Sequence, residues 1–541
     1  MRGLTELLLE APALKALVCG LKRYDRQHVH GVGGGHQALV CAALGRDDRP
    51  VLVVTPGERE AVVFAENLAT LLPERGVFLF PAWEILPGRV LAYSKHIGAR
   101  RVQVLEALLC GHNPVVVAPV EALARHLTPP DVVREAMFSL STGDSWVPEN
   151  LRRRLLAAGY EPVGRVDAVG QFAARGGILD VFVYTAEAPV RIEFFGDEIT
   201  SMRWFDPETQ RSRAETGRVV VVPAGELVVQ EHLWAAGAAA LRHEYGLQLA
   251  RLKRRGDTEA ARRLQERLDG VLGLVETRSG FPGVEDLLPY FYPQPATLMD
   301  YLDPRTILLL SEPDRIAEVA ASTDHQRTQG FAALLEQGRI LPGQYRLYLD
   351  HERLFREMRR FPVVYVSLFG RIGRFPKPER EVVFGVRELP VTLGRSEAVL
   401  AEVRRRTAAK QAVALLVGTE DRARRLLSIL RQDGLPAFRS ADLRKMLPGQ
   451  VAVGAGRLHE GFEIPETGLV ILTEREIYGK QLHDRRKTRP SPRRAPEELD
   501  LNPGDYVVHA NHGIGRYQGI VLLEIAGVKR EYRSEERRCR E

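Results

Sequence analysis

Cysteine is scarce in this sequence. Its four residues, Cys19, Cys41, Cys110 and Cys539, are scattered among 541 positions, and no two of them stand in a CxxC spacing. Such a set supports neither a disulfide framework nor a zinc site. Long apolar runs are also missing, because no stretch approaches the roughly 20 residues that cross a bilayer. The first ten residues read as an amphipathic helix and lack the cleavage site of a signal peptide. We therefore expect a soluble, cytoplasmic protein without a membrane partner.

A strong net charge is absent as well. The formal charge of +6 is small for this length, and a composition of 45% hydrophobic and 27% charged residues is that of ordinary globular protein. Basic residues gather in three clusters, at Arg251–Arg267, Arg353–Arg374 and Lys480–Arg494. Charge runs of this kind are usually solvated helix faces or linkers. Non-specific contact with DNA through these clusters is the alternative, which the charge permits without requiring it.

The first part of the chain, residues 1–128, alternates two hydrophobic patterns. Val51–Val54 and Pro114–Ala118 are continuous apolar runs bounded by turn residues, as buried parallel strands are. Glu58–Leu72 and Ile97–Leu109 between them have the 3.6-residue period of helices. This order predicts a doubly wound α/β domain, and the fold class of the whole chain is α/β and multidomain.

Residues 129–223 change character. Gly176–Phe182, Val190–Phe195 and Arg218–Val222 are strand-like runs separated by turns, which predicts a β-rich insertion. Long amphipathic helices and apolar strand-like runs, Thr306–Leu310 and Val363–Val366, return in residues 224–384. We interpret residues 1–128 and 224–384 as two parts of one α/β domain that the insertion splits.

Three more segments follow. Residues 385–483 read as a second, small α/β domain, in which Thr419 is placed to cap the helix Thr419–Asp433. Residues 484–500 are basic and proline-rich with almost no apolar side chain, as linkers are. Residues 501–541 begin with β-like, glycine-punctuated runs, and the strand pattern stops after Tyr532, where a charged tail follows. We expect this last domain to be truncated.

A glycine-rich segment near the N-terminus has the shape of a phosphate-binding loop, because backbone N–H groups before a helix can cradle phosphate oxygens. Its residues of interest are Gly31, Gly33, Gly34, Gly35 and Gln37. A working loop ends in Gly-Lys-Ser/Thr, whose lysine neutralises phosphate and whose hydroxyl holds Mg²⁺. Here His36, Gln37 and Ala38 occupy the last positions. We expect a degenerate nucleotide loop that packs the first helix onto the sheet. Weak anion binding is the alternative, and no catalytic residue or metal site is predicted.

The order of the motifs matches a known family. The glycine-rich loop, then Phe80–Pro87, then Val115–Val120 resemble the first domain of bacterial transcription-repair coupling factors, which is itself similar to the excision-repair protein UvrB. The insertion resembles the UvrA-binding domain shared by both families; the matching segments are Ala158–Tyr160, Phe172–Phe182 and Arg191–Ile199. Gly280–Glu285 resembles the return segment of the split domain. The resemblance covers residues 1–532.

The last domain has its own resemblance. Gly504–His509 and His512–Tyr517 resemble the start of the Tudor-like domain by which coupling factors hold RNA polymerase, a pattern that CarD-type regulators share. The resemblance implies that polymerase contacts, on its β subunit, fall on Tyr506, His509, His512, Gly513, Gly515, Arg516 and Tyr517. Because the strand pattern stops early, weakened polymerase binding is expected.

For the insertion, the resemblance implies that Arg175 contacts UvrA, since it stands at the family's Arg-Gly step. A planar guanidinium can bind a partner's carboxylate bidentately. Gly176 is interpreted as permitting a bulge or a close backbone approach. Arg165 is a second candidate contact, with plain solvation as the alternative. Phe172 lies three residues before Arg175, which places it on the opposite strand face and in the core.

The resemblance predicts a monomeric, non-motor scaffold for transcription-coupled nucleotide excision repair, which recruits UvrA and needs no cofactor. Coupling factors carry an ATP- and Mg-dependent DNA translocase motor that this sequence lacks, so we expect no enzyme. Two alternatives remain: an ATP-dependent helicase or translocase of the UvrB type, which Gln37 and Ala38 argue against, and a general damaged-DNA-binding module.

Overall fold

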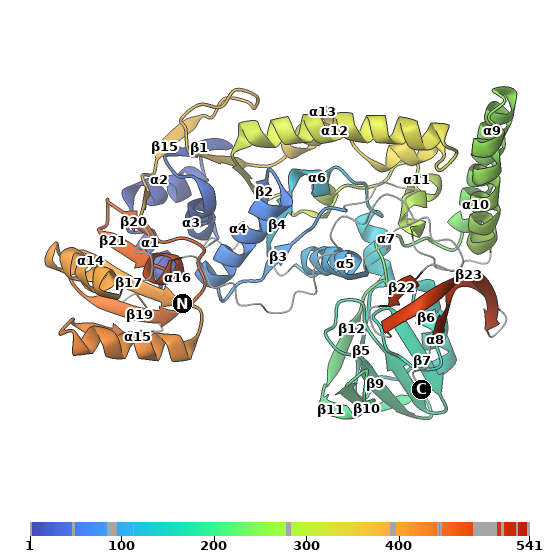
Figure 1. The fold of residues 1–541 in the computed structure, drawn as a ribbon, viewed down its shortest axis with the longest axis horizontal. Coiled ribbons are helices and arrows are strands. Elements are labelled where there is room, and N and C mark those ends of the chain that lie inside the picture. The colour runs from blue at the N-terminus through green and yellow to red at the C-terminus, as the bar shows by residue number, and fades with distance from the viewer. Residues whose placement is uncertain are drawn as a thin grey trace. The chain divides into compact units, whose positions relative to one another are not determined.

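The computed structural model describes residues 3–45, 49–83, 95–111, 113–276, 283–389, 396–440, 443, 446–479, 506–509, 513–525 and 528–537. The chain separates into two compact units, residues 1–480 and 481–541 (Figure 1). Residues 84–87 of the first resembling segment, residues 280–282 of the return segment, the whole predicted linker 484–500, and Cys539 lie outside the described residues. Within the described ranges, no helix is both long and apolar enough to span a bilayer.

A seven-stranded parallel sheet is the centre of the first unit. Its order is β15-β1-β14-β13-β2-β4-β3. The strands are β1 (Arg26–His30), β2 (Val51–Thr55), β3 (Val77–Leu79), β4 (Val115–Pro119), β13 (Ile307–Ser311), β14 (Val363–Ser367) and β15 (Arg380–Val383). Ile307 of β13 pairs with Val51 of β2, so the chain returns after more than 180 residues to complete the sheet that it began. The predicted α/β fold is confirmed.

Helices cover both faces of this sheet, as the side chains of a fully buried strand require. In β2, Val51 and Val53 face the cluster that contains α1 (Leu4–Leu8), α2 (Pro12–Gly20), α3 (Gln37–Leu44) and α4 (Glu58–Leu71). Leu52 and Val54 face the opposite cluster. That second layer contains α5 (Lys95–Leu109), α6 (Val120–Leu123), α12 (Pro313–Glu336) and α13 (His351–Met358).

The β-rich insertion forms a six-stranded sheet in the order β11-β10-β9-β8-β7-β6. These strands are β6 (Glu161–Pro162), β7 (Gln171–Arg175), β8 (Ile178–Val181), β9 (Val190–Phe195), β10 (Glu198–Phe205) and β11 (Ser212–Glu215). β5 (Phe138–Ser141) pairs with β12 (Arg218–Val221) beside it. Leu151 and Leu155 of α8 (Pro148–Ala157) pack on the sheet's inner face with Phe172, Leu179 and Ile192. Helix α7 (Pro130–Ala136) precedes β5.

A buried ion pair joins the end of the insertion to the α/β core. Arg101 of α5 is fully buried, and its guanidinium donates to both carboxylate oxygens of Glu226 and, over 2.7 Å, to the carbonyl oxygen of Pro81. The ring of Phe80 lies 3.9 Å from the guanidinium carbon, and the Trp83 indole N–H donates to Glu226 over 3.2 Å. Both charged groups of this buried pair have hydrogen-bond partners, so the pair positions Glu226, where the chain returns from the insertion to the core.

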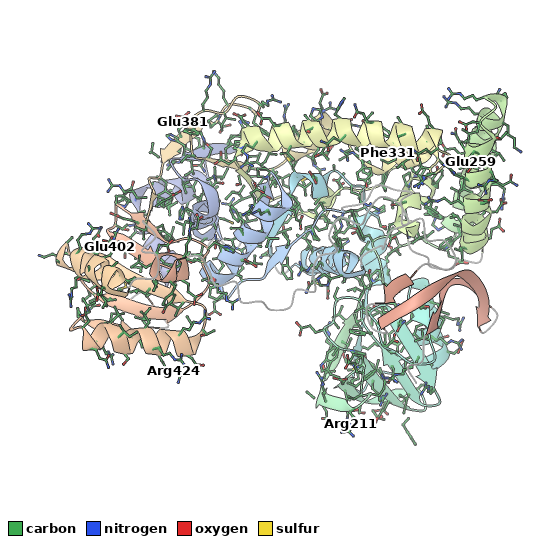
Figure 2. All side chains as sticks on the ribbon, in the orientation of Figure 1. Arg211, Glu259, Phe331, Glu381, Glu402 and Arg424 are labelled. Carbon is green, nitrogen blue, oxygen red and sulfur yellow. The ribbon has the colours of Figure 1, made fainter. Side chains whose placement is uncertain are left out.

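The helical segment after the insertion contains two long helices that pack on each other, α9 (Leu233–Arg254) and α10 (Thr258–Glu276). Short helical pieces then lead to β13; they are η2 (Val284–Leu287), α11 (Leu288–Phe291) and η3 (Leu298–Tyr301). A further one, η4 (Pro342–Leu347), lies between α12 and α13. Figure 2 shows Glu259 of α10 on the outside of the molecule, while Phe331 of α12 is buried. In the basic cluster Arg251–Arg267 the basic side chains are exposed except that of Arg267, which is half-buried, while the buried positions are apolar: Leu252, Ala260, Ala261 and Leu264.

A second six-stranded sheet, in the order β16-β20-β21-β17-β19-β18, follows. Its strands are β16 (Arg387–Glu388), β17 (Ala412–Val417), β18 (Ala437–Arg439), β19 (Val451–Ala455), β20 (Phe462–Ile464) and β21 (Leu469–Leu472), with α14 (Ser396–Ala408), α15 (Glu420–Gln432) and α16 (Glu474–Tyr478). The side chain of Thr419 accepts from the Arg422 N–H, so the predicted N-cap of α15 is confirmed. The strands β16, β18 and β20 were not predicted. They are short, and two of them lie at the sheet edges.

The second unit contains three antiparallel strands in the order β22-β23-β24. They are β22 (Tyr506–His509), β23 (Gly513–Ile525) and β24 (Val528–Arg537). The prediction that the strand pattern stops at Tyr532 is wrong, because β24 pairs with β23 as far as Arg537 opposite Gly515. The backbone ladder does not require apolar side chains, so charged residues can continue a strand that hydropathy alone would end.

Candidate docking surface and glycine-rich loop

The glycine-rich loop follows β1 and leads through a short 3₁₀ turn, η1 (Gly34–His36), into α3. Gly31 and Gly34 have φ angles of +91° and +54°, a backbone region that residues with a β-carbon rarely adopt. The loop therefore has the strand-turn-helix shape that the sequence indicated. Leu39, Val40 and Leu44 of α3 are buried against the sheet, so the loop does place this helix on the core.

Gln37 stands where a working phosphate loop has lysine, and it is fully buried. Its amide nitrogen donates to the Val32 carbonyl oxygen over 3.1 Å and to Glu312 Oε1 over 2.7 Å. Its amide oxygen accepts from Ser311 Oγ over 2.5 Å. The side chain thus joins the loop to the junction between β13 and α12, and both of its N–H donors are used within the protein.

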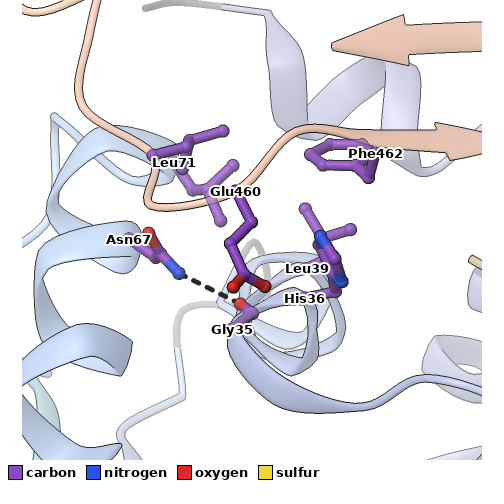
Figure 3. A pocket seen from close by; sticks show the side chains of 8 residues that line it. Gly35, His36, Leu39, Asn67, Leu71, Glu460 and Phe462 are labelled. Atoms are coloured by element: carbon purple, nitrogen blue, oxygen red, sulfur yellow. Dashed lines mark hydrogen bonds between the residues drawn. The ribbon is translucent and has the colours of Figure 1, made fainter. Parts of the chain in front are cut away.

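The space in front of the loop is filled from the second α/β sheet. The Glu460 carboxylate faces the loop, where Oε2 would lie 3.9 and 4.0 Å from β-carbons placed on Gly34 and Gly35 (Figure 3). His36 Nε2 lies 3.1 Å from the Gly461 carbonyl oxygen, and the His36 ring meets Phe462 edge-on at 5.8 Å. The cavity that remains is about 10 Å³, which is roughly one water molecule.

Two contacts from α4 fasten the same junction. Asn67 Nδ2 donates to the Gly35 carbonyl oxygen over 3.0 Å, and Asn67 Oδ1 accepts from the His459 N–H over 3.0 Å. Thr70 Oγ1 donates to the Arg457 carbonyl oxygen over 2.6 Å. Helix α4 therefore ties the glycine-rich loop to the segment Arg457–His459 of the second sheet.

The charge around the loop is also unsuited to an anion. Glu460 approaches the loop from the second sheet, although it is paired with Arg475. Glu312 lies behind Gln37, and burial raises the pKa of its carboxyl. Across the residues that the structure describes, no group of three or more His, Cys, Asp or Glu side chains is placed to hold a metal ion. The arrangement packs the two sheets together at the loop.

The insertion brings the predicted contact residues Arg165 and Arg175 together. Arg175 ends β7, and its guanidinium donates to the carbonyl oxygen of Gly164, the residue before Arg165. Arg165 Nη2 donates to the Glu208 carbonyl oxygen over 2.6 Å. Both side chains are exposed, and among the described residues neither has a carboxylate partner. Backbone acceptors therefore hold both arginines in position without neutralising them.

The role predicted for Gly176 needs correction. Arg175 pairs with Ile178, so Gly176 and Gly177 form the two-residue turn between β7 and β8. Gly176 has a φ of +58°, and no atom lies within 4 Å of a β-carbon placed there. It is glycine because of the turn, whereas the close approach is at Gly177, whose β-carbon would lie 3.0 Å from the Phe194 carbonyl oxygen.

Two exposed apolar residues near this turn were not predicted. Phe195 ends β9 and is 82% exposed, and Ile178 at the start of β8 is 40% exposed. Ile178 pairs with Arg175 on one side and with Glu193 on the other, so strand alternation puts Arg175, Ile178 and Phe195 on one face. A signal existed in the sequence, because Ile178-Leu179 and Phe194-Phe195 each put two apolar residues in a row where one must leave the core.

The opposite face of this sheet is packed in the core. Phe172 is buried on the opposite side of β7 from Arg175, as the odd spacing predicted. Arg191 and Asp180 form a two-pronged ion pair on the exposed face, with both N–O distances at 2.8 Å. Arg211, labelled in Figure 2, directly precedes β11, and its carbonyl oxygen accepts from the Asp206 N–H in the turn whose Glu208 carbonyl oxygen holds Arg165. The arginines, Ile178 and Phe195 together form an amphipathic surface on a fixed sheet, which we call the hairpin surface: Arg165, Arg175, Ile178 and Phe195.

The residues predicted to contact polymerase fall on neighbouring strands. Tyr506 and His509 are the first and last residues of β22, and they pair with Arg516 and Gly513 of β23. Gly515 and Tyr517 are also on β23, and His512 lies outside the described residues. β22 is an edge strand of the described sheet. An edge strand has unpaired backbone groups with which a partner strand can pair.

Comparison with known protein families gives two matches. Residues 138–227 match the family described as the UvrB interaction domain. Residues 501–533 match the family described as the CarD-like/TRCF RID domain. The first match covers the β-rich sheet and the hairpin surface, and the second covers β22, β23 and part of β24.

Curated relatives match nearly the whole chain. A transcription-repair-coupling factor of Bacillus subtilis is 30% identical over 540 residues, which are 98% of this chain and 45% of the relative. A transcription-repair-coupling factor of Staphylococcus aureus is 27% identical over 498 residues, which are 91% of this chain and 42% of the relative. The chain thus spans somewhat less than half the length of these relatives.

Proposed function

We infer that this chain, which is homologous to transcription-repair-coupling factors over most of its length, serves as a binding scaffold in transcription-coupled nucleotide excision repair. Its proposed partners are UvrA, at the hairpin surface of the insertion, and RNA polymerase, at β22 and β23. The homology to the UvrB interaction domain and to the CarD-like domain supports one partner for each segment.

The observation that carries the UvrA proposal is the fixed, unneutralised position of Arg175. Its guanidinium is held by the Gly164 carbonyl oxygen, and its open side faces solvent beside Ile178 and Phe195. Interfaces owe most of their affinity to a few aromatic and arginine residues that are buried on binding. An arginine that is already oriented loses less side-chain entropy when it meets a carboxylate. The hairpin surface combines both features on a sheet whose inner face is packed in the core.

We propose that the glycine-rich loop has no nucleotide-dependent activity in this chain. The Gln37 amide forms hydrogen bonds with Glu312 and Ser311 of the same chain. Glu460 and Phe462 line the space in front of the loop. These contacts favour a structural role for the loop, and they argue against the alternative of a UvrB-type helicase. A phosphate-release assay with the purified chain, with and without DNA, tests this, and release above the buffer rate would contradict it.

Calorimetric titration of purified UvrA into the chain, with Arg175→Ala alongside, tests the scaffold proposal. For the polymerase arm, a gel shift of core polymerase with the chain and with an Arg516→Ala variant is the corresponding test. The two tests are independent, since a different segment is proposed for each partner. Arg175→Ala should leave polymerase binding unchanged, and Arg516→Ala should leave UvrA binding unchanged.

A further inference from the structure

The connection between β14 and β15 is a crossover without a helix. β14 and β15 lie on opposite sides of β1, and all three strands are parallel. Residues 368–379 must therefore pass from the carboxyl end of β14 over the sheet to the start of β15. We call them the crossover loop. The turn at its beginning lies at the carboxyl edge of the sheet, where α/β proteins bind their ligands.

Several hydrogen bonds and ring contacts anchor this turn. The Leu368 N–H donates to Glu312 Oε1 over 3.1 Å, and Ser367 Oγ donates to the Phe369 carbonyl oxygen over 2.6 Å. The Asp314 carboxylate at the start of α12 accepts from the backbone N–H groups of Gly373 and Arg374 at 3.0 Å. The loop is also anchored by Phe375, whose ring lies 4.9 Å from Phe355 and 5.9 Å from Tyr365.

The anchored turn directs four side chains away from the core. Phe369 is 74% exposed and Leu368 is 49% exposed, and Arg371 and Arg374 are exposed beside them. Leu368 packs on the glycine-rich loop, where its side chain would meet a β-carbon placed on Gly33 at 3.4 Å. We call this set the edge patch: Leu368, Phe369, Arg371 and Arg374.

The arginines of the edge patch form no ion pair with a carboxylate of the described residues. Residues 367–378 contain two arginines and a lysine and no acidic residue. In the part of the chain that the structure describes, neither arginine has a carboxylate within ion-pair distance of its side chain. Two carboxylates adjoin the loop without pairing with these arginines: Glu312 accepts from Gln37 and Leu368, and Asp314 accepts from the backbone N–H groups of Gly373 and Arg374.

We propose that the edge patch is a binding site for single-stranded nucleic acid, with Phe369 as a stacking platform for a base and Arg371 and Arg374 as phosphate contacts. Proteins that hold single strands combine an exposed aromatic ring with basic residues along the backbone path. The site is distinct from the hairpin surface and does not depend on the scaffold proposal.

The exposed ring is the reason for choosing a single strand over a duplex. Bases inside a duplex are stacked on each other, so a duplex can use the arginines but gains nothing from Phe369. Unpaired bases present their faces, and each stacked base contributes about 1–3 kcal/mol in alanine-substitution measurements. An acidic protein segment could also meet the two arginines. It would have no preference for the flat ring over another apolar side chain, which separates it from a nucleic acid in the test.

Fluorescence anisotropy with a labelled 20-nucleotide oligothymidylate and with a matched duplex tests the proposal on the full chain. The variants are Phe369→Ala, Phe369→Leu and the double variant Arg371→Ala/Arg374→Ala. Arg254→Ala/Arg255→Ala is the control, because it removes two exposed arginines from the end of α9, in another basic cluster. Melting curves check that each variant folds, and unlabelled polyglutamate serves as competitor.

We expect the chain to bind the single strand and Phe369→Ala to weaken that binding about tenfold, with Phe369→Leu equally weak and duplex binding unchanged. The arginine double variant should lower the slope of log affinity against log salt by about 1.4, since each phosphate contact on a single strand contributes about 0.7. The proposal is overturned if the chain does not bind the oligonucleotide at low salt, or if the control loses as much affinity as the loop variants. If polyglutamate at equal charge displaces the oligonucleotide and Phe369→Ala does not change the affinity for it, the patch is assigned to an acidic protein partner instead.

Discussion

The guanidinium of Arg175 donates a hydrogen bond to the carbonyl oxygen of Gly164, the residue next to Arg165. This bond brings two arginines from different parts of the insertion to one end of its sheet. Because the acceptor is a neutral backbone oxygen, the positive charge of Arg175 is positioned and not cancelled. The hairpin surface is therefore preorganised for a partner that supplies carboxylates.

Phe195 should act with Arg175. The ring is 82% exposed at the end of β9, so replacing it removes little of the folded structure. We expect Phe195→Ala to weaken UvrA binding by about 1–2 kcal/mol, in the range of an interface anchor, with an unchanged melting temperature. Calorimetry and melting curves measure the two effects. Leu247→Ala is the control, since Leu247 is an exposed leucine on α9. Equal UvrA affinity for Phe195→Ala and the parent chain would show that Phe195 does not contribute to UvrA binding.

Gln37 should be a stability residue. In Gln37→Leu, Ser311 loses its acceptor and Glu312 loses a donor in a buried site. We expect the free energy of unfolding to fall by about 2–3 kcal/mol, because buried polar groups without partners are costly. Denaturant unfolding measures this change, and Gln432→Leu on the exposed end of α15 is the control. A Gln37→Leu variant as stable as the parent chain would show that these bonds do not hold the loop.

Glu285 should make stability depend on pH. Its carboxyl is buried, Oε2 has no hydrogen-bond partner among the described residues, and burial raises its pKa to about 7. Arg125 lowers this pKa, whereas Glu226 and Asp286 raise it further. The folded state therefore holds the proton more tightly than the unfolded chain, so this group opposes folding above pH 7 and the penalty disappears as the pH falls to about 4.5.

The variant Glu285→Gln removes this charge at every pH. We expect it to be more stable than the parent chain at pH 8 by about 3 kcal/mol, with the difference shrinking toward pH 5. Urea unfolding of both proteins at several pH values measures the difference. A difference that stays constant between pH 5 and pH 8 would mean that Glu285 does not titrate in this range.

The ion pair of Arg101 with Glu226 should be essential to the junction of the insertion. Arg101→Met leaves Glu226 charged and buried beside Trp83. We expect a loss of about 3–5 kcal/mol in unfolding free energy, the usual cost of breaking a buried pair on one side. Arg100→Met is a matched control, because Arg100 is the preceding residue of α5 and is exposed. Similar denaturant midpoints for the two variants would contradict a structural role for the pair.

Local pattern predicted much of the fold. The apolar runs of β2 and β4 and the cap of α15 by Thr419 depend on neighbours in sequence, and so they could be recognised without a structure. β15 could not, because a four-residue strand with two charged positions carries little hydropathic signal. The position of Gly176 in a turn follows from its pairing across β7 and β8, and the sequence shows the glycine but not the pairing.

The contacts of the glycine-rich loop were even harder to predict from the sequence. The absence of the lysine and of the hydroxyl was visible at Gln37 and Ala38. What occupies the loop was not, because Glu460 and Phe462 come from more than 400 residues further along the chain. The exposure of Phe369 was also hidden, since hydropathy assigns a phenylalanine beside a strand to the core, and at Phe194-Phe195 the sequence indicated that one ring is exposed but not which one.

The most direct test of the scaffold account is the affinity of the purified chain for UvrA, measured by calorimetry with Arg175→Ala and Arg153→Ala in parallel. Arg153 is an exposed arginine on α8, the helix that packs on the inner face of the same sheet, and it controls for charge. The account predicts binding by the parent chain, a loss of about 2 kcal/mol or more in Arg175→Ala, and no change in Arg153→Ala. Absence of binding by the folded parent chain, or equal affinity for all three proteins, would contradict it.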